Sequence, residues 1–70
     1  MLKVKDKVVI INPESNRKQM FKDQKASIVE VRCRLLSGVE YKLQFEDADL
    51  QKWNSICMFR FTDRELTKIK

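Results

Sequence analysis

The chain has 70 residues, a formal net charge of +5 at pH 7 and no histidine. Seventy residues is near the smallest size at which one core holds a fold without disulfides or a metal, so we expect a single domain over residues 1–70. Without histidine, the usual general base and the commonest metal ligand are missing. We therefore expect no enzymatic activity, no cofactor, no metal and no small-molecule substrate.

The chain also lacks the signals of export or membrane insertion. No stretch of about 18 apolar residues is present, which argues against a membrane partner. The first residues, Met-Leu-Lys-Val-Lys-Asp, do not form the apolar run of a signal peptide. Cys33 and Cys57 are too few for a disulfide framework, and each is expected to be a buried thiol that faces the core. These features predict a cytoplasmic protein.

The first predicted strand is the β-branched run from Lys7 to Ile11. The polar segment from Asn12 to Gln24 follows, with Met20 and Phe21 as its only large apolar residues. Thirteen residues is long for a connection in a compact domain, and such loops often carry function.

Two apolar segments, Lys25 to Leu35 and Val39 to Phe45, predict an antiparallel hairpin. Their apolar residues share one face if Leu36-Ser37-Gly38 forms a three-residue loop. The expected cross-strand pairs are Leu35 with Val39, Cys33 with Tyr41, Val31 with Leu43, and Val29 with Phe45. Gly38, the only glycine, stands where a left-handed residue is needed. The apolar parity changes near Ile28 to Glu30, which predicts a bulge there.

The last third of the chain predicts two short strands. Glu46-Asp47-Ala48-Asp49 is expected to be a solvated turn, and Ile56 to Phe61 a fourth strand. Asp63 can cap a short helical turn, and Thr67 to Ile69 can form a fifth strand. Trp53 either covers one end of the fold or remains exposed as an interface anchor.

Short strands, a long first loop, a central hairpin and a helical turn before the last strand predict an all-β, five-stranded SH3-like barrel. Four segments are similar to those of small SH3-like, KOW-type modules. They are Lys5-Asp6-Lys7-Val8-Val9-Ile10, Lys25-Ala26-Ser27-Ile28-Val29-Glu30-Val31, Tyr41-Lys42-Leu43-Gln44-Phe45-Glu46-Asp47, and Phe59 to Ile69. Many modules of this kind are encoded by phages, prophages and plasmids, and the resemblance implies a small binding protein.

The positive charge is concentrated in the first half of the chain. Residues 1–35 contain nine Lys or Arg and four acids, whereas residues 36–70 contain six of each sign. This asymmetry favours nucleic-acid or nucleoprotein binding through an outward strand face and the long first loop. The candidate binding residues are Arg17, Lys18, Phe21, Lys22, Lys25, Arg32, Arg34 and Lys42. Phe21 is either a base-stacking platform or a plug that joins the loop to the core.

The alternative function is protein recognition. In this hypothesis the long loop and a strand edge bind a partner such as a host protein, and Trp53 is the candidate anchor. A row of aromatic residues for proline-rich peptides is not available among six aromatics that are mostly needed for the core.

Overall fold

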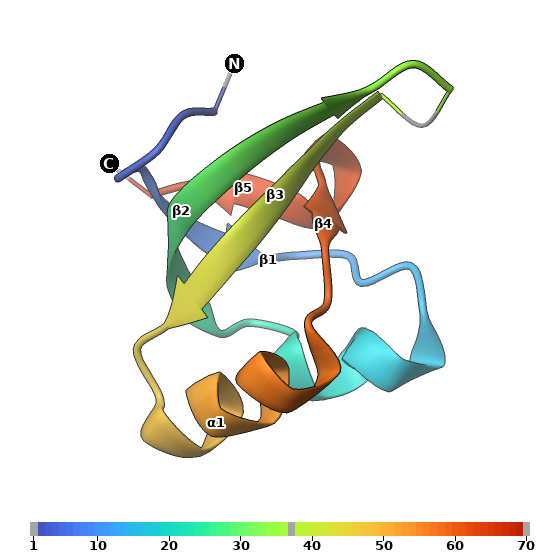
Figure 1. Cartoon of the computed structure of the whole chain (residues 1–70). Coiled ribbons are helices and arrows are strands. Elements are labelled where there is room, and N and C mark those ends of the chain that lie inside the picture. The colour runs from blue at the N-terminus through green and yellow to red at the C-terminus, as the bar shows by residue number, and fades with distance from the viewer. Residues whose placement is uncertain (1, 37, 70) are drawn as a thin grey trace.

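The computed structural model describes residues 2–36 and 38–69, which form one five-stranded antiparallel sheet and a ten-residue α-helix. In chain order the elements are β1 (Lys7–Ile10), the 3₁₀-helix η1 (Asn16–Phe21), β2 (Lys25–Arg34), β3 (Gly38–Phe45), α1 (Ala48–Cys57), β4 (Phe61–Thr62), the 3₁₀-helix η2 (Asp63–Glu65) and β5 (Leu66–Lys68). The strand order is β4-β3-β2-β1-β5 (Figure 1). The mostly-β class is thus confirmed.

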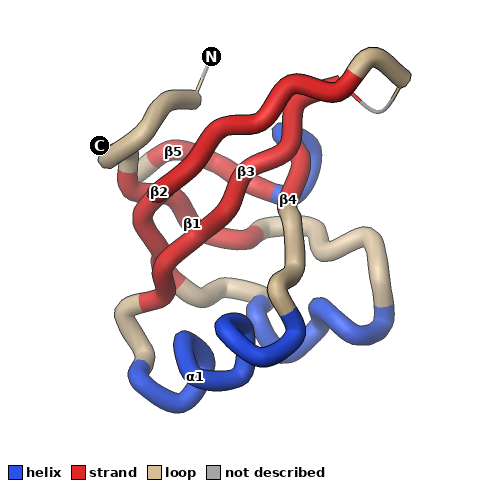
Figure 2. Tube along the Cα trace, viewed as in Figure 1, coloured by secondary structure: helices blue, strands red, loops and turns tan. Residues whose placement is uncertain are grey.

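The expected closed barrel is wrong. The strands β4 and β5 are the two edges of the sheet, and no pairing joins them within residues 2–36 and 38–69. The two edge strands contain only two and three residues. Figure 2 shows α1 and η1 at one end of the molecule, while the β2–β3 hairpin extends toward the other end.

The β2–β3 hairpin is confirmed, but its register differs from the expected one by two residues on the tip side of the bulge and by three residues before it. Val31 pairs with Tyr41 rather than with Leu43, and the strands end at Arg34 and begin again at Gly38. Ser37, part of the expected loop, lies outside the described residues. Because the difference on the tip side is an even number of residues, the apolar and polar faces keep their identities there. Gly38 has the expected left-handed conformation, with φ of 79°.

The bulge expected in β2 is also confirmed, because the pairing shifts between Ile28 and Glu30. It changes the parity of the strand, so Ala26 and Ile28 are buried before it. Val29 is the unpaired residue and is exposed, so its expected core position is wrong. Cys33 is exposed as well, because it lies near the hairpin tip, beyond the core.

The helix α1 replaces the second half of the expected turn and the first two residues of the expected fourth strand, of which only Phe61 lies in β4. Asp47 begins the helix, because its Oδ1 accepts hydrogen bonds from the backbone N–H groups of Asp49 at 2.9 Å and Leu50 at 3.0 Å. Met58 ends it in the left-handed conformation, with φ of 55°. Cys57 is therefore the exposed last residue of a helix rather than a core residue of a strand.

Polar side chains attach α1 to the edge of β3. The backbone N–H of Phe45 donates to Gln51 Oε1 at 2.8 Å, and Asn54 Nδ2 donates to the carbonyl of Leu43 at 3.3 Å. The strand β4 pairs only with Glu40 and Tyr41, so α1 covers the part of the β3 edge that β4 does not reach. Side-chain amides thereby satisfy backbone groups that an edge strand would leave open.

The core contains one aromatic cluster around Phe21. Its ring stacks on Phe45 at 4.6 Å between centroids and meets Phe59 and Phe61 edge-on at 5.7 Å. The other buried apolar residues are Val8, Ile10, Ala26, Ile28, Tyr41, Leu43 and Leu66. Phe21 therefore connects the 12–24 segment to the core of the sheet.

Candidate functional site

The two arginines of the hairpin lie on its outward face and form ion pairs with acids of that same face. Arg32 Nη2 lies 3.1 Å from Glu30 Oε1, and Arg34 Nε lies 2.6 Å from Glu40 Oε1. Lys42 is exposed on β3 beside Glu30 in the strand register. Of the three hairpin cations expected to bind phosphates, Arg32 and Arg34 thus already form intramolecular ion pairs, although both side chains remain about half exposed.

Lys18 and Phe21 point into the protein. Lys18 Nζ lies 3.2 Å from Glu65 Oε1, donates to the carbonyl of Arg60 at 2.5 Å, and lies 4.9 Å from the centroid of the Phe61 ring. Phe21 is fully buried, as expected for a core plug. Neither side chain is presented to a ligand at the surface.

Glu65 is the partner of Lys18 that sequence reasoning missed. Its side chain is fully buried and accepts hydrogen bonds from the backbone N–H groups of Glu14 and Thr62, both at 3.0 Å. One carboxylate thus joins the 12–24 segment, η1 and the β4–η2 corner. The only signal in the sequence was Glu65 itself, three residues after Thr62 at the start of a helical turn.

Arg17, Lys22 and Lys25 are exposed near η1 and at the start of β2. Figure 1 shows η1 at the opposite end of the molecule from the hairpin tip that follows Arg34. The eight candidate residues therefore do not form one continuous surface.

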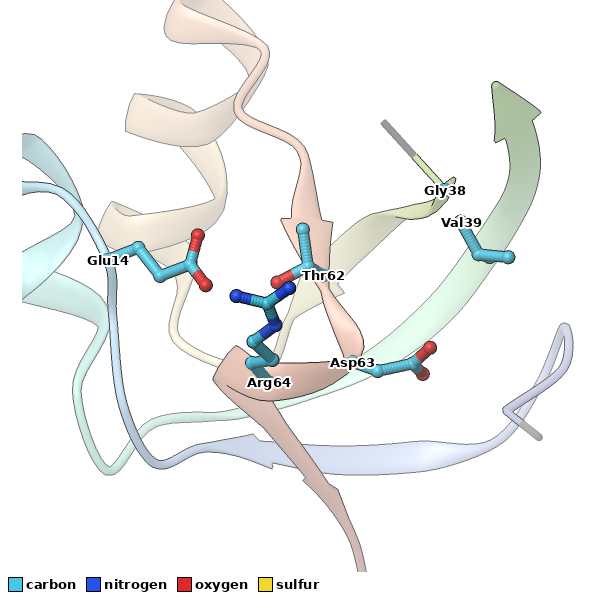
Figure 3. Close-up of a pocket in the computed structure, with 6 residues that line it drawn as sticks. All are labelled: Glu14, Gly38, Val39, Thr62, Asp63 and Arg64. Carbon is cyan, nitrogen blue, oxygen red and sulfur yellow. The ribbon is translucent and has the colours of Figure 1, made fainter. Parts of the chain in front are cut away.

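A mixed-charge pocket of about 320 Å³ lies beside β4 and η2. Its lining residues are Glu14, Gly38, Val39, Thr62, Asp63 and Arg64. In Figure 3, the Arg64 side chain extends toward Thr62 and Glu14, whereas Asp63 points away from both. No cysteine lines this pocket, and the chain has no histidine, so it offers neither a thiol nucleophile nor an imidazole base.

The contact between Tyr41 and Asp63 beside this pocket can be tested by titration, because Tyr41 is the only tyrosine in the chain. Burial, the hydrogen bond from its hydroxyl to Asp63 Oδ1 at 2.8 Å and the charge of Asp63 raise the pKa of Tyr41 to about 12. An unfolded tyrosine has a pKa of about 10. Stability contributed by neutral Tyr41 is therefore present below pH of about 10 and is lost as the pH rises through about 12.

We expect an ultraviolet titration of the native protein to give a tyrosinate midpoint near 12. The protein in concentrated urea should titrate near 10. Asp63→Asn should lower the native midpoint, because it removes the negative charge beside the phenol. A native midpoint equal to that in urea would contradict the buried Tyr41–Asp63 contact.

An exposed apolar surface lies on α1 and the end of η1. Trp53 is 48% exposed and Ile56 is 65% exposed on α1, and Met20 of η1 is exposed beside them. A groove of about 380 Å³ between the two helices, here called the α1–η1 groove, is lined by Arg17, Met20, Trp53, Cys57 and Phe59. A neighbouring hollow of about 460 Å³ is lined by Asp49, Leu50, Lys52, Trp53 and Ile56.

The attachment of α1 explains why this surface is apolar. Gln51 and Asn54 face β3, so the residues on the opposite side of the helix are directed outward. Trp53, Ile56 and Cys57 occupy that outward side at spacings of three and four residues. Sequence reasoning identified Trp53 as a candidate anchor, but the strand expected at 56–61 obscured the rest of the surface.

Comparisons with protein-family models, with curated proteins and with solved structures find no match to this chain. Across residues 2–36 and 38–69, no cluster of three or more Cys, Asp or Glu residues is placed to hold a metal ion. The described part of the chain also contains no helix that is long and apolar enough to cross a membrane.

Proposed function

We propose that this chain is a non-enzymatic protein-recognition module that binds its partner through the α1–η1 groove. The observation that carries the proposal is the half-exposed indole of Trp53, which lies between two apolar hollows. Tryptophan is enriched among the residues that dominate binding energy in protein interfaces. A contiguous exposed apolar surface on a small protein marks an interaction site.

Charge indicates what kind of segment the groove accepts. Arg17 is the only charged residue that lines the groove, and it forms no salt bridge within the described part of the chain. A partner that places a large apolar side chain against Trp53 would bring its neighbouring groups beside this guanidinium. The groove therefore suits a peptide segment in which an apolar residue is adjacent to Asp or Glu.

We also propose that the fold is an open relative of the predicted SH3-like barrel. The long first connection, the central hairpin and the helical turn before the last strand support this relation. The insertion of α1 between β3 and β4 accompanies the shortening of β4 to two residues. In this proposal, α1 takes over the coverage of the β3 edge and adds the binding surface.

Selection of a random peptide library displayed on phage against the immobilised protein tests the docking surface. We expect enriched peptides to combine an apolar residue with Asp or Glu, and Trp53→Ala to reduce their affinity by about tenfold or more. Val29→Ala is the matched control, because Val29 is similarly exposed but does not line the groove. Arg17→Glu should shift the selected sequences from acidic toward basic residues.

The same variants separate this function from nucleic-acid binding. Nucleic-acid binding would weaken by about one log unit of affinity per log unit of salt for each phosphate neutralised. It would also depend on Arg32 and Arg34 rather than on Trp53. No peptide enrichment, together with salt-sensitive DNA or RNA binding that Trp53→Ala leaves unchanged, would overturn the proposal in favour of the nucleic-acid hypothesis.

A further inference from the structure

One edge of the strand β2 is covered by the rest of the sheet only in its first half. On that side β1 pairs with residues 25–27, and the last backbone contacts are made by Ile28. From Val29 to Arg34, no described segment pairs with this edge, and Figure 1 shows the tip half of β2 extending past β1. This stretch is here called the free edge of β2. An unpaired strand edge presents N–H and C=O groups with which another strand can pair.

Val31 and Cys33 direct their backbone groups toward the free edge. Ile28 shows the direction, because its N–H donates to the carbonyl of Asp6 at 2.9 Å and its carbonyl accepts from the N–H of Lys5 at 2.8 Å. Residues of one strand whose side chains share a face also direct N–H and C=O toward the same edge. Ile28 is in the core, Val31 packs against the core, and Cys33 follows two residues later on the same face. Their N–H and C=O groups are thus available to a second strand.

The side chains along the free edge have a pattern that a second copy of the same strand complements. In an antiparallel pair with a two-fold axis at Arg32, Glu30 lies opposite Arg34 of the partner subunit. The side chains of Glu30 and Arg34 are 42% and 52% exposed, so each can contact a second charge besides its own ion-pair partner. On the other face, Val31 lies opposite Cys33 of the partner subunit. Opposite charges therefore meet on one face and apolar groups on the other.

Two exposed apolar residues at the ends of the free edge fit the same axis. Val29 is 41% exposed at the bulge, and Leu35 is fully exposed directly after Arg34. The axis brings Val29 beside Leu35 of the partner subunit, which removes apolar surface of both from water. The two Arg32 side chains meet at the axis, where each keeps its own Glu30 at 3.1 Å.

We propose that two copies of this chain form a symmetric dimer in which the free edges of β2 pair antiparallel about Arg32. The two sheets join into one continuous sheet, and Val31 exchanges backbone hydrogen bonds with Cys33 of the partner subunit. The α1–η1 groove contains none of the free-edge residues. The dimer is therefore independent of the proposed recognition of a protein partner.

Sedimentation velocity of the intact chain, at protein concentrations from about 10 μM to about 1 mM, tests this pairing. We expect a monomer that converts to a dimer, with slower amide hydrogen exchange at Val31 and Cys33 as the dimer forms. Glu30→Arg and Arg34→Glu should each weaken self-association by about tenfold or more, because each places like charges opposite one another at both contacts. An equimolar mixture of the two variants should dimerise again, since the mixed dimer restores opposite charges at both contacts.

Lys25→Glu is the matched control, because Lys25 is exposed on β2 but lies outside the free edge, and this variant should dimerise as the native chain does. Cys33→Pro removes the N–H that faces the partner and should also weaken the dimer, whereas Cys33→Ser keeps that N–H and should not. A native chain that stays monomeric throughout the concentration series would overturn the proposal. A dimer that the two charge variants leave unchanged, or a mixture of them that stays monomeric, would also overturn it.

Discussion

Glu65→Ala is expected to destabilise the protein by about 3–5 kcal/mol, because it leaves the largely buried ammonium of Lys18, whose side chain is 16% exposed, without its carboxylate. The backbone N–H groups of Glu14 and Thr62 lose their acceptor as well. Globular proteins have a free energy of unfolding of about 0.05–0.15 kcal/mol per residue, or about 4–10 kcal/mol for a chain of this length. Urea denaturation followed by Trp53 fluorescence should show a partly or wholly unfolded variant.

Two further variants separate the ion pair from general damage to the core. Lys18→Met with Glu65→Leu removes both charges, so the double variant should be more stable than the sum of the single effects predicts. Arg32→Gln removes the exposed pair with Glu30 and should cost less than about 1 kcal/mol. A urea midpoint for Glu65→Ala close to that of Arg32→Gln would contradict the structural role assigned to Glu65.

Phe21→Ala is expected to cost about 3–5 kcal/mol, because it leaves a cavity at the centre of the aromatic cluster. Its ring also attaches η1 to the core, so its loss should release the helix that forms one wall of the α1–η1 groove. We expect hydrogen exchange to accelerate first in Asn16–Phe21, and thermal unfolding to occur at a lower temperature.

Met20→Ala is the control for Phe21, since Met20 is the preceding residue of η1 but is exposed. It should change stability by about 0.5 kcal/mol or less while reducing binding in the groove. Phe21→Leu keeps much of the apolar volume and should cost less than Phe21→Ala, so the comparison is available even if the alanine variant fails to fold. Equal stability of the Phe21→Ala and Met20→Ala variants would rule out the plug role.

Only part of the candidate site could be predicted from the residue types in the sequence. Arg32 and Arg34 are placed outward, as alternation predicts, yet the acids beside them become visible as partners only through the hairpin geometry. The sequence left two alternatives for Trp53, a cover for one end of the fold or an exposed anchor, and its exposure on α1 is compatible with the second. The groove around it required α1, and the capping Asp47 was the available sign of that helix.

Local pattern by itself determined β1, the apolar face of the β2–β3 hairpin, the bulge near Glu30, the conformation of Gly38 and a short last strand. These features follow from side-chain alternation and backbone sterics, which act over a few residues. Side-chain alternation could not determine the hairpin register, because a shift of two residues leaves the alternation unchanged.

Tertiary structure decided the open sheet, the exposure of Cys33 and Cys57, and the burial of Glu65 with Lys18, 47 positions away along the chain. It also decided that Gln51 and Asn54 would attach α1 to β3 and turn Trp53 outward. Each of these outcomes depends on which partner is available across space to satisfy a polar group or cover an apolar one. Which partners lie close enough is decided when the elements pack together, and the spacing of neighbouring residues along the chain does not determine it.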